Sequence, residues 1–245
     1  FFFDQTRHYV KIFNSTYIHK ILKNHKWIND KDFPKSSFPV PMRSEATYQR
    51  KLETAEPLTP DEQQELEHKL GFTYRQAIGE LLFALVTCRP DISFATIKLS
   101  QYSTRPAKIH FDAVMQVYVY LRDTCNEGIY YWRSKPRSDL PIGPMPITKR
   151  DGDYNHDEIE ECTQESPTRL LAATDSDFAG DTSHRRSVSG VVAKLAGGAV
   201  LYKTAYQPTV ACSSTEAEWT AAASAAKHIL YLRTIMEEIG MHQED

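Results

Sequence analysis

The sequence predicts an α+β protein in which a mostly helical region precedes a unit of three antiparallel strands and one long helix. Apolar residues recur at helical spacing through much of residues 15–122, whereas from residue 170 they follow the pattern of short strands. Between the two regions, prolines and acidic residues occur without periodicity, which is typical of a flexible linker. We therefore expect three parts, formed by residues 1–133, 134–168 and 169–245.

The first part begins with a strand pattern at residues 9–13, and Ser15 then opens an amphipathic helix. Between Asp30 and Pro60 the apolar periodicity disappears and four prolines occur, which predicts an extended connection without a helix. Four helices are expected after Thr59, which is suited to cap the first of them. Their predicted ranges are 61–70, 74–87, 91–102 and 106–122.

After the linker, strands are expected over residues 170–178, 188–195 and 199–206, with Gly197-Gly198 as the turn between the last two. A long helix is predicted from Ser214 to Ile239. Ser213 and Glu216 have the spacing of a capping box at its start, and Gly240 is suited to the left-handed position at its end.

The composition excludes some classes of function and leaves others open. No run of about 18 apolar residues occurs, so no membrane span is expected. The four cysteines lie far apart without zinc-binding spacing and are expected to be reduced thiols, about half of them buried. The start at Phe1 lacks the features of a signal peptide and indicates a fragment. The net charge of -3 shows no basic surplus of the kind that nucleic-acid-binding proteins usually have. Basic residues nevertheless gather between Lys11 and Lys26, where they form either a solvated helix face or a surface that contacts phosphate.

Two pairs of carboxylates stand out in the last part, Asp175 with Asp177 and Glu216 with Glu218. The end of a strand and the start of a helix can meet at one edge of a sheet, where carboxylates would hold hard cations such as Mg²⁺. A structural alternative exists for two of them, because Glu216 fits the capping box and Asp177 can simply end a strand. Glu218 shares its helical face with apolar residues, so we expect it to point toward the strands and Glu216 to cap the helix. That apolar stripe consists of Ala222, Ala225, Ile229, Leu232 and Met236.

Several short motifs stand out along the chain. In the last part they are Thr174-Asp175-Ser176-Asp177-Phe178-Ala179-Gly180, Arg185-Arg186-Ser187-Val188-Ser189-Gly190, Gln207-Pro208-Thr209-Val210 and Ser213-Ser214-Thr215-Glu216-Ala217-Glu218-Trp219. In the first part they are Tyr17-Ile18-His19-Lys20-Ile21-Leu22, Tyr74-Arg75-Gln76-Ala77-Ile78-Gly79-Glu80-Leu81-Leu82 and Arg89-Pro90-Asp91-Ile92-Ser93-Phe94-Ala95. Together these motifs resemble copia-type LTR retrotransposon Pol polyproteins. The later motifs resemble the RNase H domain of that family, and the earlier ones resemble the segment that follows its polymerase palm.

The resemblance implies a reverse transcriptase thumb and connection-like region followed by the first half of an RNase H domain. The parent polyprotein would copy RNA into DNA and hydrolyse the RNA of RNA–DNA hybrids. Asp175 and Glu218 match its catalytic, metal-binding carboxylates, Asp177 is a further candidate ligand, and two Mg²⁺ ions are implied. Arg185, Arg186 and Ser189 are candidate contacts to nucleic acid or residues that only fix a turn, and the basic segment adds Lys20 and Lys23.

The resemblance also sets limits. The polymerase motif Tyr-x-Asp-Asp does not occur, and in the family a third acidic ligand lies in a strand beyond the long helix, so the isolated chain is expected to be inactive. The implied partners are an RNA–DNA hybrid or duplex and the rest of the Pol polyprotein, without a membrane or a small-molecule cofactor. The implied locations are cytoplasmic virus-like particles and the nucleus. The alternative is a decayed or adopted retroelement relic that at most binds nucleic acid or protein.

Overall fold

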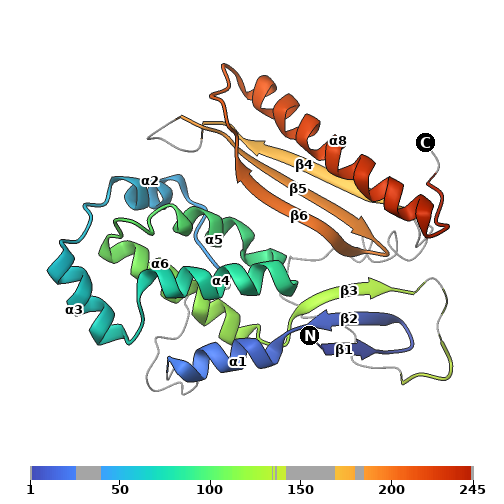
Figure 1. Cartoon of the computed structure of the whole chain (residues 1–245), viewed down its shortest axis with the longest axis horizontal. Helices are drawn as coiled ribbons and strands as arrows, with labels where there is room; N and C mark the ends of the chain where they lie inside the picture. The colour runs from blue at the N-terminus through green and yellow to red at the C-terminus, as the bar shows by residue number, and fades with distance from the viewer. Residues whose placement is uncertain are drawn as a thin grey trace. The chain divides into compact units, whose positions relative to one another are not determined.

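The structure is a computed structural model that describes residues 2–25, 40–133, 135, 137–141, 169–179 and 185–243. The described residues form helices and two three-stranded sheets, which confirms the α+β class (Figure 1). The chain divides into two compact units, one of residues 13–128 and one of residues 2–12 together with 129–245. Most of the predicted linker, residues 134–168, lies outside the described residues, so its flexibility stays a prediction.

The first unit contains the helices before the linker. Short polar side chains begin several of them, since the side chain of Asn14 accepts from the backbone N–H of Tyr17, and that of Thr73 accepts from Gln76. Thr59 and Glu62 form a capping box, as the sequence had indicated for Thr59. The helices are α1 (Ser15–Asn24), α2 (Ala46–Thr54), α3 (Pro60–Leu70), α4 (Tyr74–Cys88), the 3-10 turn η1 (Pro90–Ile92), α5 (Ser93–Ser100) and α6 (Lys108–Asp123).

Helix α2 contradicts the predicted extended connection, and tertiary contacts explain the difference. The buried Lys98 Nζ on α5 lies 2.5 Å from Glu53 Oε1 on α2. Nδ1 of the buried His110 accepts from the Ala107 N–H at 2.8 Å, so Nε2 carries the proton and donates to Leu52 O, also at 2.8 Å. Burial lowers the pKa of His110 more than the hydrogen bond to Leu52 raises it. The lowered pKa keeps the ring neutral. Helix α2 is therefore held by residues of α5 and α6.

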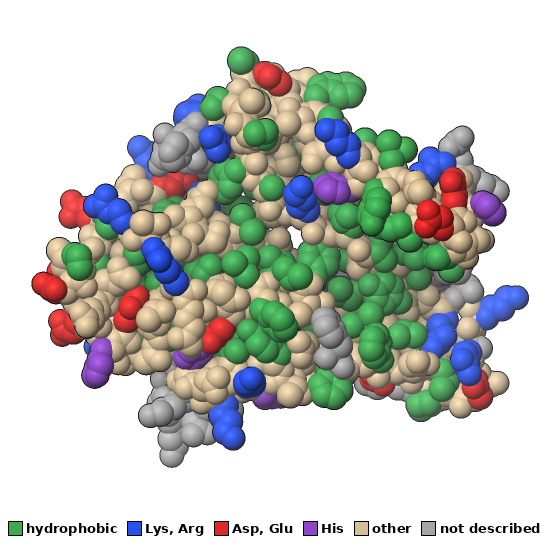
Figure 2. All heavy atoms as spheres, viewed as in Figure 1, with side chains coloured by type: hydrophobic (Ala, Val, Ile, Leu, Met, Phe, Trp, Pro, Cys, Tyr) green, Lys and Arg blue, Asp and Glu red, His purple; other side chains and the backbone are tan. Residues whose placement is uncertain are grey.

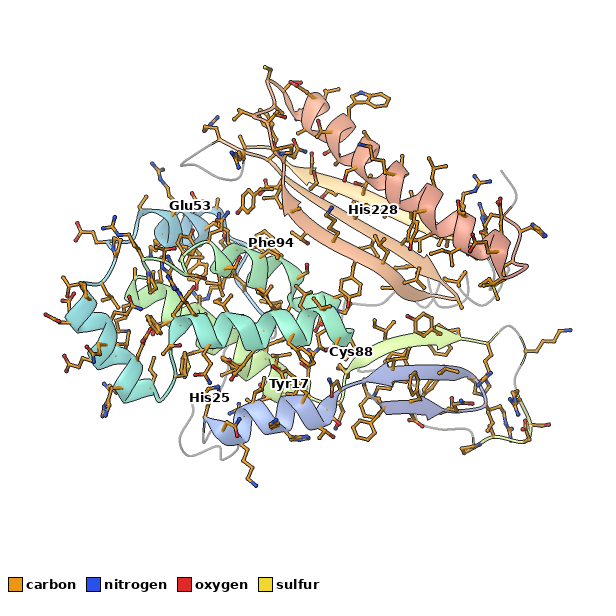
Figure 3. The ribbon with its side chains drawn as sticks, viewed as in Figure 1. Tyr17, His25, Glu53, Cys88, Phe94 and His228 are labelled. Atoms are coloured by element: carbon orange, nitrogen blue, oxygen red, sulfur yellow. The ribbon has the colours of Figure 1, made fainter. Side chains whose placement is uncertain are left out.

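A second buried network centres on Glu80 of α4. Its carboxylate accepts hydrogen bonds from Tyr118 Oη at 2.6 Å and from Gln76 Nε2 at 3.1 Å, and His25 Nε2 lies 2.7 Å away (Figure 3). Burial alone would raise the pKa of Glu80, but hydrogen bonds from His25, Tyr118 and Gln76 outweigh it and leave the pKa below its ordinary value. The network ties α1 and α6 to α4.

The Arg89-Pro90-Asp91 segment forms a third network. Arg89 is only 1% exposed, and its Nη2 lies 2.7 Å from Asp91 Oδ2 and 2.6 Å from Thr124 Oγ1. Tyr120 Oη donates to the same Asp91 oxygen at 2.8 Å. Part of the helix predicted over residues 91–102 is therefore η1, which turns the chain so that Asp91 meets Arg89.

The second unit contains both sheets. The first has the order β1 (Phe2–Gln5), β2 (Tyr9–Phe13) and β3 (Gly128–Trp132). Strand β2 confirms the predicted strand, whereas β1 and β3 were not predicted. The buried Tyr9 ring lies edge-on to Tyr130 at 5.1 Å and to Trp132 at 5.7 Å between ring centroids, so aromatic packing joins β2 to β3.

The second sheet confirms the three predicted strands as β4 (Leu171–Asp177), β5 (Val188–Leu195) and β6 (Gly198–Tyr206), paired antiparallel in that order. The hairpin turn lies one residue earlier than predicted, at Ala196 and Gly197, whose φ values are 50° and 76°. Gly198 instead begins β6, at a position where a Cβ atom would collide with Tyr131 of β3. Tyr131 Oη also donates to Ala199 O at 2.8 Å, so β3 packs on the start of β6.

Helix α8 (Ser214–Glu238) runs along the second sheet and packs on β4 and β5 (Figure 1). Gly240 follows it with a φ of 79°, as predicted for the residue that ends this helix. Strand β4 lies at the edge of its sheet, and most of its residues are exposed. None of the helices that the structure describes combines the length and hydrophobicity that a membrane span needs.

Candidate functional site

The predicted carboxylates lie at one end of the second sheet. Asp175 is opposite Gly190 of β5, and Asp177 is opposite Val188 in the last pair of the ladder. Both aspartates are exposed. Gln207, at the end of β6, donates to Ala217 O in the first turns of α8, and it also donates to Ser189 Oγ. Ser189 is paired with Ser176, which lies between Asp175 and Asp177 on β4. Gln207 therefore holds the start of α8 at the same end of β4 as the two aspartates.

The start of α8 contains one half of the predicted capping box, whereas Glu216 bonds to a neighbouring N–H group instead of that of Ser213. Ser213 Oγ accepts from the Glu216 N–H at 3.1 Å, and the Glu216 carboxylate accepts from the Cys212 N–H at 2.6 Å. Glu216 therefore satisfies a free N–H group beside the helix start, where the helix dipole also favours a negative charge.

The argument that singled out Glu218 through burial is wrong. The buried residues of α8 are Ala217, Ala221, Ala225 and Met236, whereas Glu218 is exposed at the border of that stripe. Ala217, Ala221 and Ala225, spaced four residues apart, form the row that packs on the sheet. Their small side chains allow the helix to approach the sheet closely. No cation is therefore needed to offset burial of Glu218, and its role as a ligand rests on its place at the end of the sheet.

The strand register decides which face of the sheet α8 covers. Lys203 of β6 is opposite the buried Val191, which is opposite Thr174, so these side chains share one face. Lys203 Nζ lies 3.4 Å from Nε2 of His228 on α8, so this is the face that α8 covers (Figure 3). Since side chains alternate along a strand, Asp175 and Asp177 project from the other face. Asp175 and Asp177 therefore do not face α8, and Glu218 could meet them only around the end of the sheet.

The donors present at this end are oxygen ligands of the kind that Mg²⁺ prefers. Across the part of the chain that the structure describes, no three His, Cys, Asp or Glu side chains are close enough together to hold a metal ion. Asp175, Asp177 and Glu218 have oxygen donors of that kind but do not form such a group, and a two-metal site needs further carboxylates.

The candidate nucleic-acid contacts are divided between the two units. Lys20 and Lys23 are exposed on α1, whereas Arg185 and Arg186 are exposed just before β5. Arg185 adopts a left-handed conformation with a φ of 57°. Ser189 is half-buried, and its hydroxyl accepts a hydrogen bond from Gln207 at 2.9 Å. Among the described side chains on the face seen in Figure 2, Lys and Arg are spread between acidic and apolar ones.

Sequence reasoning missed Gln207, which is 2% exposed and joins β5 to α8. The residue begins the Gln-Pro-Thr-Val motif, so the signal was present in the sequence without a role attached to it. The cysteines in the described residues, Cys88, Cys125 and Cys212, are unpaired thiols as predicted. Cys88 is buried, and burial raises the pKa of its thiol.

The fold and the site define an α+β protein whose second sheet carries acidic side chains at one end. Comparison with known proteins places this protein more narrowly. The chain is 28% identical over 194 residues to the retrovirus-related Pol polyprotein from transposon TNT 1-94 of Nicotiana tabacum, a match that covers 79% of the chain. It is 27% identical over 168 residues, or 69% of the chain, to the corresponding polyprotein from transposon RE2 of Arabidopsis thaliana. Several relatives of this chain are thus retrovirus-related Pol polyproteins from plant transposons.

The chain spans only 12% and 9% of the length of these two polyproteins. It is also 31% identical over 159 residues to the secreted RxLR effector protein 161 of Plasmopara viticola, a match that covers 65% of the chain and 90% of that protein. No family model and no solved structure matches the chain.

Proposed function

We propose that this chain is a segment of a retrotransposon reverse transcriptase and that its second sheet with α8 forms the first half of an RNase H domain. The observation that carries the proposal is the antiparallel order β4-β5-β6 followed by α8, with Asp175 near the end of the first strand and Glu218 near the start of the helix. Similarity to Pol polyproteins of plant transposons also supports it. The polyprotein would copy RNA into DNA and remove the RNA strand of the hybrid.

In this proposal Asp175 and Glu218 are the catalytic carboxylates, and with Asp177 they hold Mg²⁺. Bound divalent cations would supply the Lewis acidity that activates water and stabilises the leaving oxygen. The chain's own task is to fix the carboxylates, which the β4–β5 ladder does for Asp175.

Lys20, Lys23, Arg185 and Arg186 would contact the phosphate backbone of an RNA–DNA hybrid, with Ser189 as a further donor. The first four are exposed and can reach a ligand without loss of an internal contact described above. Ser189 already accepts a bond from Gln207, so only its own hydroxyl hydrogen is offered to a phosphate. Affinity should fall steeply as salt rises, because phosphate contacts release counterions. The rest of the Pol polyprotein is the expected partner, in cytoplasmic virus-like particles and then in the nucleus.

The decisive experiment compares the 245-residue chain with a longer Pol protein that contains it, using an RNA–DNA hybrid with a labelled RNA strand. The longer protein should cleave the RNA in Mg²⁺, whereas the 245-residue chain should not. Asp175→Asn and Glu218→Gln should each reduce cleavage by about 100-fold or more through loss of a ligand charge. Glu237→Gln is the matched control, because Glu237 is exposed near the far end of the same helix. Cleavage that survives both site variants would refute the assignment.

A second candidate function follows from the match to 90% of the secreted RxLR effector protein 161, because a region of this size exists there outside a polyprotein. The chain would then be an adopted or decayed retroelement relic that binds nucleic acid or protein without chemistry. The flanking reading frame separates the two candidates. An open frame with Tyr-x-Asp-Asp upstream and further acidic strands downstream favours the enzyme, and nearby stop codons favour the relic.

A further inference from the structure

Gln207 is the residue through which the end of the second sheet holds the start of α8. It is 2% exposed, and its Nε2 donates to Ser189 Oγ at 2.9 Å and to Ala217 O at 2.8 Å. An amide nitrogen carries two hydrogens, so both donors of the side chain are used. One acceptor lies on β5 and the other on α8, and the side chain therefore bridges the strand and the helix.

The backbone of Gln207 extends this bridge to β4. Its N–H donates to Ser187 O at 2.8 Å, and Ser187 is fully buried. Ser187 Oγ in turn accepts from the N–H of Ala179 at 3.1 Å, in the turn that follows β4. Gln207 and Ser187 together thus join the three segments at this end of the unit: the turn after Asp177, strand β5, and the turn of α8 next to Glu218.

The remaining polar atom of Gln207 shows that the residue is not placed there for packing alone. Its Oε1 is buried without a hydrogen-bond partner among the described residues, which costs free energy. An apolar side chain of similar volume would avoid that cost. What an apolar side chain cannot supply is the pair of donors that fixes Ala217 to Ser189. The use of glutamine here is explained by the need for that pair.

We propose that Gln207 is a positioning residue of the carboxylate site. Ala217 immediately precedes Glu218, and Ser189 is directly opposite Ser176, which lies between Asp175 and Asp177. The Gln207 bridge therefore sets where Glu218 stands relative to the two aspartates. The inference rests on the proposed RNase H function, because it assigns Gln207 a role in the geometry of that site without contact to substrate or metal.

The test replaces Gln207 by methionine in the longer Pol protein, since methionine keeps the volume and length but has no donor. Displacement of Glu218 should lower kcat about tenfold while leaving KM for the hybrid within about twofold, because the phosphate contacts are unchanged. Mn²⁺ binding, followed through the electron paramagnetic resonance signal of the free ion, gives a readout besides activity. The Mn²⁺ dissociation constant should rise in Gln207→Met as it does in Asp175→Asn.

Ser213→Ala is the matched control. It weakens the start of the same helix by removing the cap but leaves the Gln207 bridge in place, so kcat and Mn²⁺ affinity should stay within about twofold of wild type. A loss in Ser213→Ala equal to that in Gln207→Met would show that general weakening of α8 is sufficient and would overturn the positioning role. Wild-type values in a folded Gln207→Met protein would overturn it as well.

Two further outcomes are decided by the same measurements. If circular dichroism shows that Gln207→Met does not fold, Ser189→Ala replaces it, because that change removes the acceptor on β5. It also removes a candidate phosphate donor, so Mn²⁺ affinity is then the deciding measurement and KM for the hybrid is not. A reduced kcat and Mn²⁺ affinity then support the bridge, and unchanged values overturn it. If the wild-type protein neither cleaves the hybrid nor loses Mn²⁺ on Asp175→Asn, the proposed function itself fails, and the positioning role fails with it.

Discussion

Replacing Gly198 by alanine should weaken the second unit by pushing β3 away from β6. The added methyl carbon would lie 2.5 Å from Cδ1 of the Tyr131 ring and 2.7 Å from Tyr130 O. Carbon atoms in favourable contact are about 3.5–4.0 Å apart, so both approaches are too close. The Tyr131 ring can rotate, but the Tyr130 carbonyl is part of the strand and moves only with β3. Rotation of the ring about its own axis leaves Oη in place, whereas a swing of the whole Tyr131 side chain would break the bond from Oη to Ala199 O.

The expected loss follows from these contacts. Overpacking of a well-packed site costs about 1–3 kcal/mol, and loss of the Tyr131 hydrogen bond adds about 1 kcal/mol, so Gly198→Ala should lower the free energy of unfolding by about 2–4 kcal/mol. Urea denaturation followed by far-ultraviolet circular dichroism measures it.

Gly190→Ala is the matched control in the same sheet, because the nearest atom to its added methyl is Asp175 O at 4.0 Å. That distance is ordinary contact, and the unfolding free energy should change by less than about 1 kcal/mol. If both variants unfold at the same urea concentration, the close approach of β3 to β6 is not a feature of the folded protein in solution.

Three further predictions concern the helices and their networks. Gly79→Ala in α4 meets no atom within 4 Å and should raise the free energy of unfolding by about 0.5–1 kcal/mol in the same urea experiment. Because the pKa of Glu80 is lowered, its stabilising effect is complete above its ordinary value of 4.5 and is lost as the pH falls through the lowered pKa. Glu80→Gln should therefore flatten the fall in stability below that pH, and an unchanged pH profile would contradict the network. Ser213→Ala should cost about 1 kcal/mol by removing the cap of α8, measured as faster amide hydrogen exchange in its first turn.

The sequence was sufficient for the elements whose signals are local. Strands β5 and β6 and helix α8 lie within one residue of their predicted bounds, because Ser213 caps the helix and Gly240 ends it through their own backbone and side chains. The bond from the Glu216 N–H to Ser213 was equally predictable from their three-residue spacing, but that spacing did not indicate that the Glu216 carboxylate bonds to Cys212. The hairpin turn was off by one residue because either glycine could supply a positive φ.

The missed elements depend on contacts distant in sequence. Helix α2 has few apolar residues and is held by Lys98 and His110, which are more than forty residues away. Strand β3 is too short to be distinguished from the end of a helical region, and it is fixed by pairing with β2 and by Tyr9. The face of Glu218 was misjudged for a similar reason, because helical periodicity alone does not decide which of two adjacent rows, that of Ala217 or that of Glu218, approaches the sheet.

The edge position of β4 affects how the protein behaves at high concentration. Among the residues that the structure describes, β4 pairs with β5 alone, and its sequence from Leu171 to Asp177 contains no proline or lysine that would keep another strand from joining it. Its two aspartates are the only charges that oppose stacking of one molecule on the next, and both lie toward one end. Magnesium would neutralise that repulsion, so concentrated samples should aggregate more readily when the cation is added. Light scattering with and without Mg²⁺ would reveal such association before crystallisation or spectroscopy is attempted.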